Sequence, residues 1–213
     1  TNGTAVNLDP LVVDMTLADV AASGGAFGVL LDQVEGSFTI AGAVNVIGAI
    51  TAGIAVQNNT AQAKPLTANF NGAVTVNNTT GMGLSITNND GATIAFAGGG
   101  TGVDIVTTSG AGLIAHGGGT ISLTGSGNTI ETETGQVLSI VNTTAAAGGI
   151  AFASLTSTGT GTGTVTAATA INLNNLYGGA FSGGIVSIAG TSVAASDAVL
   201  IGDLSGADEG AAS

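Results

Sequence analysis

Short stretches in which aliphatic and other residues alternate recur along the whole chain, and each is followed by a polar turn. Three examples are FGVLLDQ (27–33), AGIAVQNN (52–59) and MGLSITNN (82–89). Alternation at a period of two predicts a short β-strand, and the Asn, Asp or Gly that follows it predicts a bend. The first aliphatic residues of the successive copies are Val6, Val29, Ile54, Leu84, Leu113, Leu138, Ile171 and Val199. Their mean spacing is about 28 residues, a period typical of stacked repeats.

Two more alternating segments lie between successive copies of this pattern. The second segment contributes the pairs Met15/Leu17, Phe38/Ile40, Leu66/Ala68, Ile94/Phe96, Ile121/Leu123, Ile150/Phe152 and Val186/Ile188. The third segment contributes Val20, Val44, Val74, Val103, Ile130, Leu155 and Val193. Three short strands in each repeat exclude a helical repeat protein.

This arrangement predicts an all-β solenoid, a parallel β-helix in which every coil contributes three short strands. Each strand pairs in parallel with its equivalent one coil along, so that like side chains stack inward in ladders. We expect seven to eight coils that form a single domain over residues 1–213. Two stretches, 156–168 and 174–184, lengthen the repeat and are predicted to leave the rod as loops.

A polar corner follows the first strand of most coils. Asn and Gly at this corner supply the left-handed backbone that branched residues resist. Stacked side-chain amides can also form a hydrogen-bonded ladder along the rod. The asparagines at this corner are Asn58, Asn88, Asn142 and Asn175, and Gly117 interrupts their row.

The composition removes several classes of function. Thirteen Asp and Glu residues stand against one Lys and no Arg, giving a formal net charge of −12, so binding to a nucleic-acid backbone is excluded. The chain has no Cys, which removes thiol nucleophiles and thiolate metal sites. Residues 38–56 are apolar enough to suggest a membrane helix, but their Gly and β-branched residues favour buried strands, and we expect no membrane span. Because the chain starts at Thr1 without a basic leader, we expect a processed or excised piece of an exported protein.

The repeat style of residues 107–143, TTSGAGLIAHGGGTISLTGSGNTIETETGQVLSIVNT, resembles that of large bacterial surface proteins with right-handed parallel β-helix regions. Residues 23–42, SGGAFGVLLDQVEGSFTIAG, have the same style. Autotransporter passengers and other secreted adhesins share it. The resemblance covers nearly the whole chain. It implies export, an extracellular or cell-surface location, and adhesion or fibre building, mostly without catalysis.

We therefore expect a non-enzymatic structural or adhesive segment. Its partners would be a surface carbohydrate or receptor, or the continuation of a longer parent chain. One alternative is a filament subunit that associates through the ends of the solenoid. Acidic residues are frequent in the first and last coils, including Asp9, Asp14 and Asp19 at one end and Asp203 and Asp208 at the other, and they would oppose such stacking.

A second alternative is a carbohydrate-active enzyme, and it depends on three acids. If Val103 and Ile130 occupy equivalent inward positions, Asp104 and Glu131 point outward as neighbours, and Glu133 shares their face. Three carboxylates on the outside of a parallel β-helix resemble the acid sites of pectin-degrading hydrolases and the calcium sites of related lyases. Those families also bring basic groups, which this chain lacks. No cofactor is expected to be required, and Asp104, Glu131 and Glu133 are candidates for weak Ca²⁺ binding.

Two further features are interpreted as structural. His116, the only His, falls at a corner where Asn88 or Asn142 of an adjacent coil could contact it, and a corner role is expected rather than a catalytic one. Thr-rich outer faces bring ice binding into consideration as a function, and ice binding needs a flat and regular array of Thr side chains. Thr75 is expected to have Asp104 and Glu131 as its counterparts in the next coils, so that face is predicted to be irregular.

Overall fold

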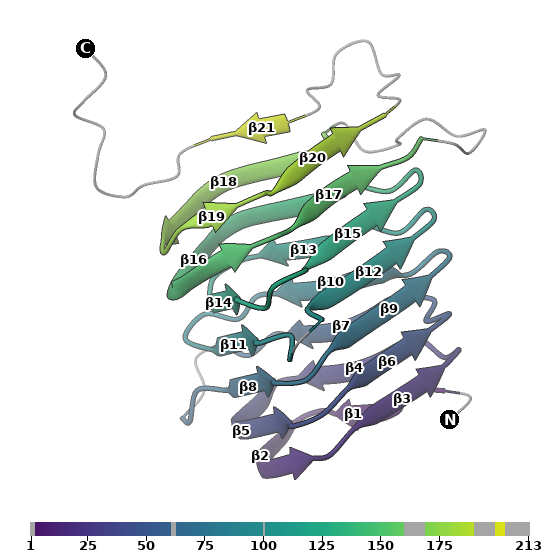
Figure 1. Cartoon of the computed structure of the whole chain (residues 1–213). Coiled ribbons are helices and arrows are strands. Elements are labelled where there is room, and N and C mark those ends of the chain that lie inside the picture. The colour runs from purple at the N-terminus through teal and green to yellow at the C-terminus, as the bar shows by residue number, and fades with distance from the viewer. Residues whose placement is uncertain (1–2, 61–62, 100, 160–168, 190–198, 203–213) are drawn as a thin grey trace.

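The computed structural model describes residues 3–60, 63–99, 101–159, 169–189 and 199–202. These residues form β-strands and no helix, and the chain winds through successive coils that stack along one axis (Figure 1). Each strand pairs in parallel with its equivalent in the next coil. The protein is therefore a parallel β-solenoid, as the repeat predicts.

The strands fall into three ladders. Ladder 1 contains β1 (Val6–Leu8), β4 (Phe27–Asp32), β7 (Ala52–Gln57), β10 (Met82–Thr87), β13 (Leu113–His116), the first part of β16 (Leu138–Ala151), β18 (Ile171–Gly178) and β21 (Val199–Ile201). Ladder 2 contains β2 (Leu11–Leu17), β5 (Val34–Ile40), β8 (Thr67–Phe70), β11 (Thr93–Phe96), β14 (Thr120–Leu123), the later part of β16, and β19 (Phe181–Ser182). Ladder 3 contains β3 (Val20–Ser23), β6 (Val44–Ile47), β9 (Val74–Asn78), β12 (Val103–Thr107), β15 (Thr129–Thr132), β17 (Ser154–Ser157) and β20 (Ile185–Ile188).

The register of ladder 1 is the predicted one throughout. Val6 lies opposite Val29, Val29 opposite Ile54, and the remaining predicted aliphatics follow in the same order to Val199. The number of turns is slightly lower than predicted. The seven strands of ladder 3, from β3 to β20, bound about six complete turns rather than seven to eight, and within the described residues the coil that begins with β21 has no strand in ladders 2 and 3.

Ladder 2 departs from the predicted register in two places. Ala68 and Phe70, rather than Leu66 and Ala68, lie opposite Phe38 and Ile40. Leu66, Ala68 and Phe70 are all fully buried. Because three successive inward positions are apolar, the sequence pattern does not show which two of them lie opposite Phe38 and Ile40. In the sixth coil Ile121 lies opposite Ala145, whereas Leu123 lies opposite Ile150, because β16 bulges between them.

In ladder 3, the predicted equivalence of Val103 and Ile130 is wrong. Ile105 lies opposite Ile130, so Val103 falls opposite Asn128. Asn128 is fully buried, and its side-chain oxygen accepts a hydrogen bond from the Val103 N–H at 2.8 Å. Its amide nitrogen donates to the carbonyl oxygens of Gly125 and Ala151, each at 2.7 Å. The hydrophobic pattern gave the wrong register between β12 and β15 because the inward position opposite Val103 is occupied by a polar residue, Asn128.

The end of ladder 3 also differs from the prediction. Val186 and Ile188 lie opposite Leu155 and Ser157, so β20, the strand within GIVSIAG, continues ladder 3 rather than ladder 2. The residue predicted for this place, Val193, lies outside the described residues. The similarity of this segment to GSFTIAG (36–42) reflects a shared strand pattern and not a shared ladder.

The prediction that residues 174–184 leave the rod as a loop is wrong. Residues 174–178 continue β18 along β16, with Leu176 opposite Thr143 and Gly178 opposite Ala145, and Phe181 then pairs with Ile150. Of the other predicted loop, 156–168, residues 156–157 belong to β17 and residues 160–168 lie outside the described part. The apolar window 38–56 forms β5, β6 and β7, and no helix in the described residues is long and apolar enough to cross a membrane.

The core is a continuous stack of aliphatic and aromatic side chains. Phe70 and Phe96 stack with ring centroids 4.6 Å apart and planes 9° apart, and Phe38 meets Phe70 edge-on. Phe96 is buried next to Leu123, as predicted. Phe152 is also buried, but its aromatic neighbour is Phe181, because the bulge in β16 moves it out of the Leu123 ladder.

The predicted polar corner is present. Asn58, Asn88, Asn142 and Asn175 all have positive φ angles between 52° and 56°. The Asn88 amide donates to the Asn58 side-chain oxygen at 3.3 Å, and the Asn175 amide donates to that of Asn142 at 2.7 Å. Gly117 occupies the corner between these two pairs and interrupts the row, as expected.

Candidate functional site

The three acids proposed as a calcium or catalytic site do not come together as the sequence suggested. Asp104 lies opposite Thr129, whose hydroxyl donates to the Asp104 carboxylate at 2.6 Å. Glu131 lies opposite Val106, one outward row further along the strand. Both acids are exposed, as predicted, but they are not cross-strand neighbours. The register error at Asn128 is the cause, because it shifts β15 by two residues relative to β12.

Glu133 follows the end of β15, and its backbone N–H donates to the Thr107 carbonyl oxygen at 3.0 Å. Over the described ranges, no three His, Cys, Asp or Glu residues are grouped so that they could hold a metal ion. Weak calcium binding by Asp104, Glu131 and Glu133 stays a prediction. Calorimetric titration of the chain against a Glu131→Gln, Glu133→Gln variant tests it, and equal responses would remove the site.

His116 contacts both neighbouring coils: its carbonyl oxygen accepts a hydrogen bond from the Asn88 N–H at 2.9 Å, as expected, whereas its side chain meets a serine rather than Asn142. Its Nε2 lies 2.7 Å from Ser139 Oγ, and the Asn172 amide donates to the same oxygen at 3.5 Å. Burial of the ring lowers the pKa of His116 below its usual value, so the imidazole is neutral at pH 7. Ser139 is 1% exposed, and a nucleophile must be open to its substrate. The arrangement therefore links β13, β16 and β18.

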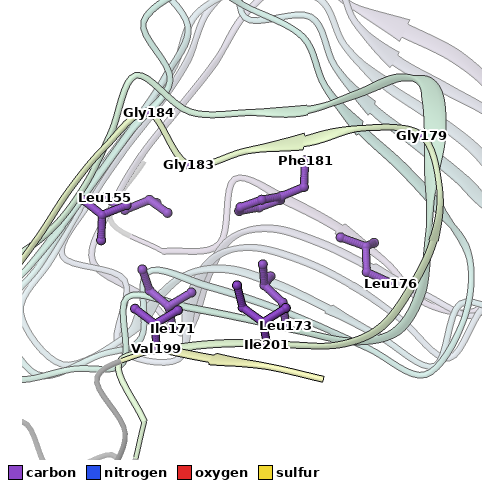
Figure 2. A pocket seen from close by; sticks show the side chains of 11 residues that line it. Leu155, Ile171, Leu173, Leu176, Gly179, Phe181, Gly183, Gly184, Val199 and Ile201 are labelled. Atoms are coloured by element: carbon purple, nitrogen blue, oxygen red, sulfur yellow. The ribbon is translucent and has the colours of Figure 1, made fainter. Parts of the chain in front are cut away.

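The C-terminal end of the rod carries an apolar cavity of about 500 Å³ (Figure 2). Side chains from all three ladders line it, among them Leu155, Leu173, Phe181 and Ile201. These are the inward positions of the last described coils, where each earlier coil is covered by the next. The cavity is therefore the interior of the solenoid at the point where the described stack ends.

Residues around this cavity are far more exposed than their equivalents inside the rod. Val186 is 46% exposed and Ile201 is 56% exposed, whereas Leu155 and Leu173, one coil earlier, are 0% and 2% exposed. Strands β20 and β21 each pair on one side only within the described residues. This end thus combines apolar side chains with unpaired backbone groups, and such an edge favours the addition of another strand.

A second surface feature lies on the outside of ladder 2. One outward position is occupied by Ser or Thr in five successive coils, and we call this set the hydroxyl row. The hydroxyl row is Ser37, Thr67, Thr93, Thr120 and Thr144. The sequence pattern does not reveal the whole row, because the predicted register of β8 is two residues out and places Thr67 in a different row. The bulge in β16 similarly concealed Thr144.

No protein-family model, curated protein or solved structure matches the chain. The assignment to a β-solenoid thus depends on the observed strand pairing. The resemblance of the chain to bacterial surface proteins depends on the style of its sequence repeat alone.

Proposed function

We propose that this chain is a non-enzymatic, extracellular structural or adhesive segment displayed at a cell surface. The observation that carries the proposal is the set of three continuous parallel ladders that run from the first coil to the apolar end of the described stack. A solenoid of this kind gives a stiff spacer whose length is set by the number of coils, at about 4.8 Å per coil. The repeat style of residues 107–143 supports an exported protein of this class.

The location can be tested on intact cells of the source organism. Protease added outside the cells is expected to remove an epitope placed on this segment, while a cytoplasmic marker stays intact. Complete protection of the epitope until the cells are lysed would contradict an extracellular location.

A second candidate function is a filament subunit, and the one-sided pairing of β20 and β21 among the described residues favours it. The occupant we propose for the C-terminal cavity is the first coil of a second copy. Val199 and Ile201 of β21 have the same spacing as Val6 and Leu8 of β1, so β1 of the second copy could extend ladder 1 beyond β21. Because the two ends differ, the contact repeats head to tail and builds an open chain of subunits.

Neighbouring residues of β20 provide a matched test. Val186 lines the cavity, whereas Ile185 is 72% exposed and belongs to the outward row opposite Ser154. Val186→Lys would place a charge inside the proposed contact and is expected to abolish concentration-dependent association. Ile185→Lys would leave the cavity lining unchanged and is expected to associate as the parent does.

Light scattering and negative-stain microscopy provide the measurements. Parent rods that stay single at every concentration would rule out the filament and leave the continuation of a longer parent chain as the occupant of the end. Equal loss of association in both lysine variants would assign the effect to net charge rather than to the cavity.

A further inference from the structure

The hydroxyl row belongs to a regular grid on the outer face of ladder 2. Two residues further along each strand lies a second outward row, made of Thr39, Asn69, Ala95 and Ser122. Adjacent strands lie about 4.8 Å apart, and positions two residues apart on one strand are separated by about 6.6 Å. Parallel pairing in constant register from β5 to β14 keeps the two rows aligned along the rod.

The side chains of the hydroxyl row have no hydrogen-bond partner within the described protein. Other Thr hydroxyls are used internally: that of Thr107 donates to the Gly110 carbonyl oxygen at 2.6 Å, and that of Thr132 to the Gly135 carbonyl oxygen at 3.0 Å. Thr67 and Thr93 are exposed, and the other three members of the row are half-buried. Their hydroxyls are therefore available to water, at one site per coil over five coils.

Between β8 and β14 the two rows carry no charged residue, although the chain carries a net charge of −12. Charged residues lie at the N-terminal edge of the face, where Asp14 pairs with Ser37 and Glu35 precedes Ser37 by two residues on β5. The outer face of ladder 3 is different, since Asp104 and Glu131 stand on it. Strongly charged groups organise water around themselves, so their absence leaves the water pattern over ladder 2 to the Thr, Ser, Asn and Ala side chains.

We propose that the outer face of ladder 2 binds a layer of ordered water and, through it, the surface of ice. Each Thr offers a hydroxyl that anchors one water molecule and a methyl group that cannot hydrogen-bond. Water over the methyl groups must keep its hydrogen bonds to other water molecules, which favours an ordered layer. The spacing of about 4.8 Å along the rod is near the shorter repeat of the prism face of hexagonal ice, so the layer can join the crystal lattice in this direction; the spacing of about 6.6 Å along a strand is shorter than the other repeat of that face.

Thr93 and Thr120 occupy the middle of the row and are the positions to change. In a Thr93→Tyr, Thr120→Tyr variant, two rings would rise above the face and hold it away from a flat crystal. Both side chains point outward, so the core is unchanged and the melting temperature is expected to match that of the parent. Thr75→Tyr places a ring on the exposed face of ladder 3 and serves as the control.

The fluorescently labelled chain is allowed to adsorb to a growing ice hemisphere, and thermal hysteresis is measured on the same samples. Parent and Thr75→Tyr are expected to coat the ice and to depress its growth temperature, whereas the double variant is expected to lose both effects. Exclusion of the parent from the ice, or full adsorption of the double variant, would overturn the proposal. Sedimentation of the parent with crystalline cellulose or chitin but not with ice would overturn it in favour of a polysaccharide surface. None of these outcomes depends on whether the rod is displayed at a cell surface.

Discussion

A few stacked phenylalanines supply much of the packing in the core of the rod. Phe96 is 1% exposed and lies between Phe70 and Leu123 in ladder 2. Removing its ring would leave a cavity that neighbouring coils cannot close, because their backbones are fixed by pairing on both sides.

Phe96→Ala is therefore expected to lower the free energy of unfolding by about 3–5 kcal/mol. Ala95→Ser, at the adjacent outward position, is expected to have little effect. Denaturant unfolding of both variants checks this. If Phe96→Ala loses no more free energy of unfolding than Ala95→Ser does, the assigned inward and outward faces are contradicted.

His116 gives the protein a stability that depends on pH. Its folded pKa lies below the ordinary value of 6.5 because burial disfavours the imidazolium form. The unfolded state then binds a proton at higher pH than the folded state does. The stabilisation is full above the unfolded pKa and is lost as the pH falls through the folded one.

Between pH 7.5 and 5, the melting temperature of the parent is expected to fall modestly, since the ring is only partly buried. His116→Gln is expected to flatten this part of the curve. Differential scanning calorimetry at several pH values provides the check, and an identical pH profile for the variant would assign the dependence to the carboxylates instead.

At the scale of strands and corners, buried asparagines join successive coils. Asn89 is fully buried; its amide donates to the Val56 carbonyl oxygen and its side-chain oxygen accepts from the Asn59 amide, both at 2.7 Å. The Asn59 side-chain oxygen in turn accepts from the Val34 N–H at 2.5 Å. The network links the corners of three coils without any charged group.

Asn89→Leu keeps a similar volume but leaves the Val56 carbonyl and the Asn59 amide without partners. It is expected to destabilise the rod by about 1–3 kcal/mol for each group left unpaired. The exposed neighbour Asn88 has a positive φ of 55°, which Gly adopts without strain, so Asn88→Gly is expected to cost far less. Thermal unfolding distinguishes the two, and equal losses would argue against the buried network.

For the whole molecule, charge and exposed edges act in opposite directions. The described first coil carries Asp9, Asp14 and Asp19, and no Arg and only one Lys exist to offset them. The acidic residues 203, 208 and 209, also expected to oppose stacking, lie outside the described residues. Unpaired strand edges favour end-to-end contact, whereas the like charges repel, and salt at about 0.1 M screens that repulsion beyond about 10 Å.

Lowering the pH toward the sequence isoelectric point of about 4.1, or adding salt or calcium, is therefore expected to promote linear association. Light scattering from pH 4 to 8, with microscopy to distinguish rods from amorphous aggregates, measures it. Amorphous precipitation alone near pH 4 would indicate loss of solubility and not stacking.

The strand pattern by itself determined the fold class, the three strands per coil, the complete register of ladder 1 and the Asn corner. These features depend on alternation and on positive φ, both of which are local properties of the chain. Much of the register of ladders 2 and 3 also followed from the pattern, but only the tertiary structure decided it at β8, β15, the later part of β16 and β20. There an inward Asn128, a bulge in β16 and three consecutive inward positions at Leu66, Ala68 and Phe70 made the local pattern ambiguous.

Those registers decide which side chains are neighbours on the outer faces. They separate Asp104 from Glu131, the pair that the sequence had placed together. They also bring Thr67 into line with Thr93 and Thr120, whose alignment the predicted register already contained. A shift of two residues keeps every inward side chain inward, so hydrophobic burial alone does not distinguish one register from the other. Pairing with the neighbouring coils does, because each strand must also satisfy the hydrogen bonds of the strands on either side.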